Sequence, residues 1–302
     1  MGVAAAGARV MTALVTPFDA RGEVDDARAA ELAEGLAARG SDGFVIAGTT
    51  GESPALTMAE KLRLCTSVRR RLNGRAAVWL GTGSYDTAES VRLTHAAEDA
   101  GAQGVMAVVP YYNRPPQAGL IAHFTAIAHA TPLPVMVYNI PGRTGTNLLP
   151  KTLAAIAAEA GNVLAVKEAS RDLEQVAEMR RLLPRAFLIY SGDDQLTLPI
   201  LSLGGAGVVS VASHLVPERI AALVAAWFAG QTAVALQAHC ALLPLYRACF
   251  ITTNPIPVKF ALRELGVPCG GFRPPLCEPG ASEAEAIRAA LREYGLVPTG
   301  PA

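Results

Sequence analysis

The residue with the clearest chemical potential is a lysine that directly follows an apolar run. Lys167 comes after Val-Leu-Ala-Val at 163–166, in a chain with only four lysines among its 26 basic residues. Burial lowers the pKa of a lysine because the ammonium form loses its hydration. The neutral amine that results condenses with a carbonyl compound to a Schiff base, which arginine cannot form. The alternative is a strand-end lysine that points to solvent or pairs with Glu168.

Four further residues could serve a reaction of this kind. Tyr138 ends another apolar run, and a phenol beside an imine can move protons as the adduct loses water. Arg143 lies in a Pro-Gly turn, and its planar guanidinium suits a substrate carboxylate. Thr49 and Thr50 precede Gly51, so two hydroxyls and exposed loop amides could hold another carboxylate. Taken singly, each has a plainer interpretation: a packing tyrosine, a surface arginine or an ordinary turn.

Other kinds of site have less support. The five histidines show no H-E-x-x-H spacing, and no G-x-S-x-G motif supports a nucleophilic serine. Asp193 and Asp194 are expected to cap the helix that follows them rather than to bind a cation. The five cysteines form no C-x-x-C pair and are expected to be buried thiols in a reducing compartment. We therefore expect neither a metal nor an organic cofactor.

The composition favours an enzyme of small molecules over a nucleic-acid or membrane protein. The 302 residues carry 26 basic and 26 acidic side chains, so there is no excess of cations to meet phosphates. No uncharged apolar stretch reaches the ~20 residues of a membrane span. The N-terminus lacks the basic start and long apolar run of a secretory signal. We expect a cytoplasmic protein whose partners are small molecules and other subunits.

The elements that must position the candidate residues alternate in type along the chain. Eight short runs rich in Val and Ile have the near-continuous apolar character of parallel strands covered on both faces. Longer segments rich in Ala, Leu, Arg and Glu separate them, and Thr57 and Glu60 fit a capping box. Eight β–α units in series predict a (β/α)8 TIM barrel; an open doubly wound sheet is the alternative, without a G-x-G-x-x-G motif to support it. The predicted strands are 10–18, 44–48, 77–81, 104–109, 134–139, 163–168, 187–192 and 207–211, and the predicted helices are 25–39, 57–72, 86–100, 117–130, 150–160, 172–183, 193–203 and 217–229.

The strand pattern stops near residue 230. We expect a barrel over 1–230 that carries the active site, and a C-terminal helical extension over 231–302 packed on it. In such barrels the reacting groups lie at the C-terminal ends of the strands, which is where the candidate residues fall. The helices predicted in the extension are 231–249, 255–266 and 282–294, with a Gly/Pro-rich loop at 267–280.

Seven motifs together resemble the dihydrodipicolinate synthase family, whose members are pyruvate-dependent class I aldolases. The likeness runs from about residue 10 to the C-terminal helix, which is nearly the whole chain. Two features depart from the family pattern, Arg171 where glycine is common and FRPPL at 272–276 where RLPL is usual, and each leaves room for a paralogue with another aldehyde substrate. The motifs are GTTGES (48–53), PYYNRP (110–115), YNIPGRTG (138–145), KEAS (167–170), SGDD (191–194), GVVSVAS (207–213) and NPIPVK (254–259).

The resemblance implies a role for each candidate residue. Lys167 would form the imine with pyruvate, and the second substrate would be L-aspartate 4-semialdehyde, giving 4-hydroxy-tetrahydrodipicolinate for lysine and diaminopimelate biosynthesis. Tyr112 would come from a neighbouring subunit, which implies a homo-oligomer, most simply a dimer of dimers. The other implied roles are a proton relay of Tyr138, Thr49 and Tyr112, a pyruvate carboxylate site at Thr50, a semialdehyde carboxylate site at Arg143, and main-chain pocket walls at Gly192 and Val209.

Two other functions stay open: a pyruvate aldolase acting on hydroxy-oxoglutarate or a keto-deoxy sugar acid, and a keto-acid-binding paralogue without turnover.

Some members of the family are inhibited by lysine between subunits, at a site where they carry histidines and an asparagine. This chain has Met58, Lys61 and Tyr85 there, with Glu89 retained. Methionine cannot replace the hydrogen bonds of imidazole, and Lys61 repels a cationic effector. We expect weak or absent inhibition by lysine.

Overall fold

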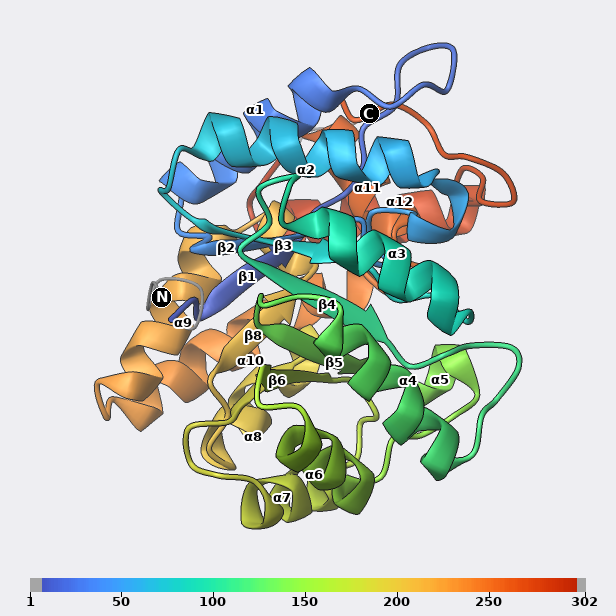
Figure 1. Cartoon of the computed structure of the whole chain (residues 1–302). Coiled ribbons are helices and arrows are strands. Elements are labelled where there is room, and N and C mark those ends of the chain that lie inside the picture. The colour runs from blue at the N-terminus through green and yellow to red at the C-terminus, as the bar shows by residue number, and fades with distance from the viewer. Residues whose placement is uncertain (1–6, 298–302) are drawn as a thin grey trace.

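Eight parallel strands close into a barrel within residues 7–297, the part of the chain that this computed structural model describes. Each strand pairs with the next in sequence, and the eighth pairs with the first. Figure 1 shows the strands at the centre of the molecule with helices around them. The predicted (β/α)8 TIM barrel is confirmed. The strands are β1 (Val10–Ala13), β2 (Gly43–Ile46), β3 (Ala77–Gly81), β4 (Gly104–Val108), β5 (Val135–Asn139), β6 (Val163–Glu168), β7 (Leu188–Ser191) and β8 (Gly207–Ser210).

The helices that follow the strands form the outer layer, with α1 and α2 on one side of the barrel and α6 and α7 on the opposite side (Figure 1). The predicted capping box of Thr57 and Glu60 is present at the start of α2. These helices are α1 (Asp26–Ala38), α2 (Met58–Leu72), α3 (Thr87–Ala97), α4 (Gln117–His129), α5 (Pro141–Thr144), α6 (Pro150–Glu159), α7 (Leu173–Leu182), α8 (Thr197–Ser202) and α9 (Pro217–Phe228), with 3-10 turns η1 (Ser53–Ala55), η2 (Asp194–Leu196) and η3 (Ala212–His214).

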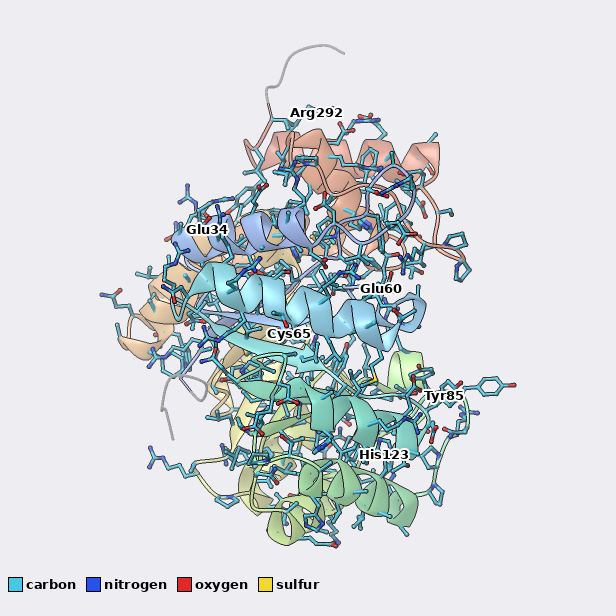
Figure 2. All side chains as sticks on the ribbon, turned by 45° about the horizontal axis from the view of Figure 1, so that its top comes forward. Glu34, Glu60, Cys65, Tyr85, His123 and Arg292 are labelled. Atoms are coloured by element: carbon cyan, nitrogen blue, oxygen red, sulfur yellow. The ribbon has the colours of Figure 1, made fainter. Side chains whose placement is uncertain are left out.

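Three more helices follow α9: α10 (Thr232–Ala248), α11 (Ile256–Glu264) and α12 (Ala281–Glu293). In both figures α11 and α12, in orange and red, lie on the same side of the molecule as α1 and α2. The loop between them contacts α2 directly, because the Arg273 guanidinium donates to both carboxylate oxygens of Glu60, at 3.0 and 2.6 Å. Figure 2 labels Glu60 on α2, on the edge toward these C-terminal elements. The C-terminal segment is therefore attached to the outer helix α2 through the Arg273–Glu60 contact.

The core has two apolar layers, one inside the barrel and one between the strands and the surrounding helices. Met136 and Tyr138 of β5 and Ala165 of β6 belong to a cluster inside the barrel. Val137 and Val166, their neighbours in sequence, belong to the larger cluster between strands and helices. Successive side chains of a strand point to opposite faces. The alternation fixes which polar residues at the strand ends face the barrel interior.

Two predicted elements differ from the structure. The first strand ends at Ala13 rather than at residue 18, because the chain turns there toward the C-terminal loop and the Phe18 amide donates to the Cys269 carbonyl at 3.2 Å. The four-residue helix α5 stands where a turn was predicted. A single helical turn is too short to show a 3.6-residue apolar repeat in sequence.

The expectation that the cysteines are buried is correct for Cys65, Cys249 and Cys269 and wrong for Cys240 and Cys277, which are exposed. Both exposed thiols lie in the C-terminal part, Cys240 on α10 and Cys277 in the loop between α11 and α12. Within residues 7–297, no helix is both long enough and apolar enough to cross a membrane.

Candidate active site

Lys167 lies near the C-terminal end of β6 and points into the barrel. It follows Ala165 on the inner face, and only 4% of its surface is exposed. Its neighbour Glu168 faces outward, where its carboxylate accepts hydrogen bonds from the Ser170 amide at 2.6 Å and from Asn139 Nδ2 at 3.0 Å. The structure therefore excludes the two plainer interpretations of Lys167, a solvent-facing lysine and an ion pair with Glu168.

Burial lowers the pKa of Lys167 to about 8. The nearby carboxylate of Asp194 acts in the opposite direction, and the positive charge of Arg143 adds to the lowering. About a tenth of the lysine is then the neutral amine at pH 7, compared with less than about one part in a thousand for an ordinary lysine. The neutral form is the one that attacks a carbonyl carbon.

Tyr138 lies beside Lys167 on the neighbouring strand. The two residues are register partners in β5 and β6, and Lys167 Nζ lies 4.2 Å from the centre of the Tyr138 ring. Burial raises the pKa of Tyr138 to about 12, opposed by Arg143 and by hydrogen bonding from Thr49. The phenol therefore stays protonated at neutral pH and can donate its proton to a group leaving the adduct.

A cavity of about 190 Å³ opens above these residues. Thr49, Tyr138 and Arg143 line it, together with Tyr111. Lys167 is buried and does not line the cavity, but its Nζ lies 4.2 Å from the centre of the Tyr138 ring, which does. Tyr138 therefore connects the amine to the cavity residues Thr49 and Arg143.

The two predicted carboxylate-binding residues come from different loops. Arg143 projects from α5 and donates from Nη2 to the backbone carbonyl of Asn254 at 3.1 Å. Thr50 is buried in the loop after β2, and its Oγ1 accepts a hydrogen bond from Asn254 Nδ2 at 3.0 Å. Both residues are thus held by one asparagine of the C-terminal segment.

Gly192, directly after β7, packs against Lys167. A Cβ atom on Gly192 would lie 3.0 Å from the Cγ of Lys167 and 2.8 Å from the Cβ of Ala169, so only glycine lets the backbone come this close. Val209 of β8 belongs to the same inner cluster as Tyr138. The structure thus places Gly192 against the lysine and Val209 inside the barrel.

Tyr112 is a predicted site residue that its own chain turns toward solvent. Its side chain is 92% exposed and its backbone has φ = 71°, a left-handed conformation that costs energy for a non-glycine residue. The neighbouring Tyr111 turns inward and lines the cavity instead. The chain therefore presents Tyr112 outward, away from its own Lys167.

The contacts that hold the loop of Thr49 and Thr50 were not predicted from sequence. Glu52, at the end of this loop, is buried with Lys259 of α11, and the Lys259 ammonium donates to Glu52 Oε1 at 2.9 Å. The same ammonium donates to the Thr16 carbonyl at 2.9 Å. Lys259 was visible in the NPIPVK motif, but nothing in the sequence pairs it with Glu52.

The two aspartates after β7 have separate roles. The Asp193 side chain caps η2 by accepting from the Gln195 amide, as predicted. Asp194 was expected to cap the same helix and does not: its buried carboxylate accepts from the amides of Val211 and Ala212 at 3.0 and 3.2 Å. A local cap could not be distinguished in sequence from a bond to the next strand end.

Comparisons with known proteins agree with this geometry. The model of the Dihydrodipicolinate synthetase family matches residues 6–294. A 4-hydroxy-tetrahydrodipicolinate synthase of Heliobacterium modesticaldum is 53% identical over 95% of this chain and 96% of its own. The crystal structure of the synthase from Cyanidioschyzon merolae with lysine bound is 47% identical, with a TM-score of 0.95 over 97% of this chain and 99% of its own.

A third relative carries a bound keto acid. The chloride-inhibited synthase from Acinetobacter baumannii, complexed with pyruvate, is 35% identical and superposes with a TM-score of 0.93 over 96% of this chain and 100% of its own. Family model, curated relatives and solved structures thus agree over nearly the full length. This chain belongs to the dihydrodipicolinate synthetase family.

Proposed function

We propose that this chain condenses pyruvate with L-aspartate 4-semialdehyde to 4-hydroxy-tetrahydrodipicolinate in lysine and diaminopimelate biosynthesis. It is a class I, Schiff-base lyase. The observation that carries the proposal is the buried Lys167 amine, 4.2 Å from the ring of Tyr138, which lines the same cavity as Arg143. A binding protein without turnover has no need of an amine whose pKa burial lowers to about 8.

The reaction follows from these positions. The neutral Lys167 amine adds to the keto carbon of pyruvate, and Tyr138 donates a proton to the oxygen, which leaves as water. Loss of a methyl proton from the imine gives an enamine, whose carbon attacks the aldehyde of the second substrate. The amino group of that substrate then attacks the imine carbon, closes the ring and frees Lys167. Thr49 and the partner subunit's Tyr112 complete the proton relay in this proposal.

Arg143 is proposed to bind the second substrate, aspartate semialdehyde, and not pyruvate. A bidentate guanidinium contact to the semialdehyde carboxylate is charge-assisted and contributes about 2 kcal/mol. Arg143→Ala is therefore expected to lower kcat/KM for aspartate semialdehyde roughly thirtyfold, while the rate of adduct formation with pyruvate changes little. Arg181→Ala, which removes an exposed arginine on α7 paired with Glu178, is the matched control. Equal losses in both steps would give Arg143 a structural role.

A steady-state assay of pyruvate with a panel of aldehydes tests the proposed function itself. The amino-acid semialdehyde should be the preferred partner, because Arg143 offers a cation to its carboxylate where a sugar offers only hydroxyls. Preference for an uncharged, hydroxylated aldehyde would assign the chain to another pyruvate aldolase. Absence of turnover with every aldehyde would support the keto-acid-binding paralogue.

The proposed role of Tyr112 in the proton relay requires a second subunit, because Tyr112 is exposed within its own chain. We propose a homo-oligomer, most simply a dimer of dimers, in which the exposed Tyr112 of one subunit enters the site of another. Tyr112→Phe is expected to lower kcat by about a hundredfold, the range of a general acid–base contribution, without lowering the thermal midpoint, because the side chain is exposed within its own chain. Tyr294→Phe serves as the control. A fully active monomer in sedimentation velocity would contradict the shared site.

The region next to Tyr111 predicts the response to lysine. Lys61 is buried there, burial lowers its pKa, and Glu89 acts on it in the opposite direction. Glu89 is thus already faced by a cation of the chain, while Met58 is half exposed and offers no hydrogen bond. We expect half-inhibition by lysine only above about 1 mM, a weak affinity, measured as initial rate against lysine concentration. Inhibition well below this level would show that the site still accepts the effector.

We also propose a division of the chain into a barrel with the active site, residues 1–230, and an extension, residues 231–302, that supports the site through Asn254 and Lys259. Residues 1–6 and 298–302 of these two parts lie outside the described residues. The cytoplasm is the proposed location, since the proposed reaction belongs to amino-acid biosynthesis.

A further inference from the structure

Asn254 lies between α10 and α11, is 5% exposed and makes two contacts with the proposed carboxylate sites. Its side-chain Nδ2 donates to Thr50 Oγ1 at 3.0 Å, and its backbone carbonyl accepts from Arg143 Nη2 at 3.1 Å. Asn254 is not one of the described residues that line the cavity. It therefore contacts Thr50 and Arg143 without lining the cavity itself.

The direction of the Asn254–Thr50 hydrogen bond decides what Thr50 can offer a ligand. A hydroxyl has one proton to donate and two lone pairs. With the amide nitrogen toward Thr50, Asn254 Oδ1 has no partner in the described chain, and one of the two Nδ2 protons is used. The reversed amide would leave both Nδ2 protons without an acceptor, and an unpaired buried N–H is rarer in proteins than an unpaired carbonyl oxygen. The amide thus occupies a lone pair of Thr50 Oγ1 and leaves its proton free for an anion.

A second contact fixes the distance between Asn254 and the Thr50 loop. Five residues after Asn254, Lys259 donates to Glu52 Oε1, and Glu52 lies two residues after Thr50. Glu52 also accepts from the backbone amide of Arg273 at 3.0 Å. Two adjacent bridges between the same pair of segments leave the asparagine little freedom to withdraw from Thr50.

We infer that Asn254 is a positioning residue that keeps the Thr50 hydroxyl turned as a donor toward the pyruvate carboxylate. The inference rests on the proposed function and adds to it a residue from the C-terminal segment. The side chain acts on the pyruvate site alone, whereas the backbone carbonyl serves Arg143. A side-chain substitution therefore separates the two contacts.

The test is a double-mutant cycle of Asn254→Ala and Thr50→Val, with KM measured for both substrates. Asn254→Ala is expected to raise KM for pyruvate about fivefold, the worth of one neutral hydrogen bond. KM for aspartate semialdehyde should stay within about twofold, since the backbone carbonyl remains. The double variant should be no worse for pyruvate than Thr50→Val alone. Asn254→Asp reverses the hydrogen bond and places an anion beside the carboxylate site, so its KM for pyruvate should rise above that of Asn254→Ala.

Asn162→Ala is the control for loss of a hydrogen-bonded, partly buried asparagine. Asn162 Nδ2 donates to the carbonyls of Ala128 and Thr131, both at 2.9 Å, just before β6 begins. This variant should lose thermal stability and keep the pyruvate KM of the unaltered chain. Multiplicative effects in the cycle, or an unchanged pyruvate KM in Asn254→Ala, would overturn the inference. Failure of the unaltered chain to form a borohydride-trapped adduct with pyruvate would instead overturn the proposed function.

Discussion

Lys167→Met is expected to abolish the adduct that borohydride traps with pyruvate and to lower kcat by roughly a thousandfold or more, as loss of a covalent nucleophile does. Methionine has an unbranched side chain like that of the buried Lys167, which packs beside Gly192 and Tyr138, but it has no amine. Intact-protein mass spectrometry detects the trapped adduct, and peptide mapping locates it. The fold should persist, since the substitution removes a desolvated amine and keeps an unbranched side chain.

The pH dependence gives a second measurement on the same residue. Because burial lowers the pKa of Lys167 to about 8, the rate of adduct formation should rise with pH and level off above about 8 in the free enzyme. An ordinary lysine would rise to above pH 10. Lys151→Met, which removes an exposed lysine of α6, should leave both the adduct and the profile unchanged. Trapping on Lys259 instead of Lys167 would refute the assignment.

Lys259→Met is expected to lower the free energy of unfolding, because it leaves Glu52 as a buried carboxylate without its cation. Both side chains of the pair are almost completely buried, with Lys259 also bonded to the Thr16 carbonyl. Removing one partner of a buried ion pair costs about 3–5 kcal/mol. In a chain of this size that lowers the thermal midpoint by about 5–8 °C. Differential scanning calorimetry measures it.

The double variant Glu52→Gln/Lys259→Met shows whether the unpaired charge is the cause. A neutral amide still accepts from the Arg273 backbone amide, so the double variant should recover part of the lost stability. Lys151→Met again serves as the exposed-lysine control and should keep the midpoint of the unaltered chain. If the double variant is less stable than Lys259→Met alone, the desolvated charge is not what the pair compensates.

The barrel could be predicted from sequence because the strands are near-continuous apolar runs and the longer segments between them have a helical composition. Thr57 and Glu60 show this well, since a capping box involves only residues three apart. The helix α5 could not be predicted, because four residues are too few for periodicity to appear. Local physics therefore determined the elements but not the short helix that carries Arg143.

The contacts that hold the site residues in place could not be predicted from sequence for a different reason. Asn254 meets Thr50 across 204 positions, and Lys259 meets Glu52 across 207. No local pattern predicts which residues meet over such separations. Lys167 was recognisable because its chemistry depends on the adjacent strand, whereas the orientation of Thr50 depends on a segment almost at the other end of the chain.

This long separation also has a consequence for synthesis. The loop with Thr49 and Thr50 leaves the ribosome before Asn254 and Lys259 have been translated, and at about 5–20 residues per second the delay is on the order of 10–40 s. A nascent chain can pair most of its strands during that time, but the threonine loop lacks its two bridges until the last quarter of the message has been read. Translation order thus keeps the Schiff-base lysine without an organised carboxylate site until the polypeptide is nearly complete.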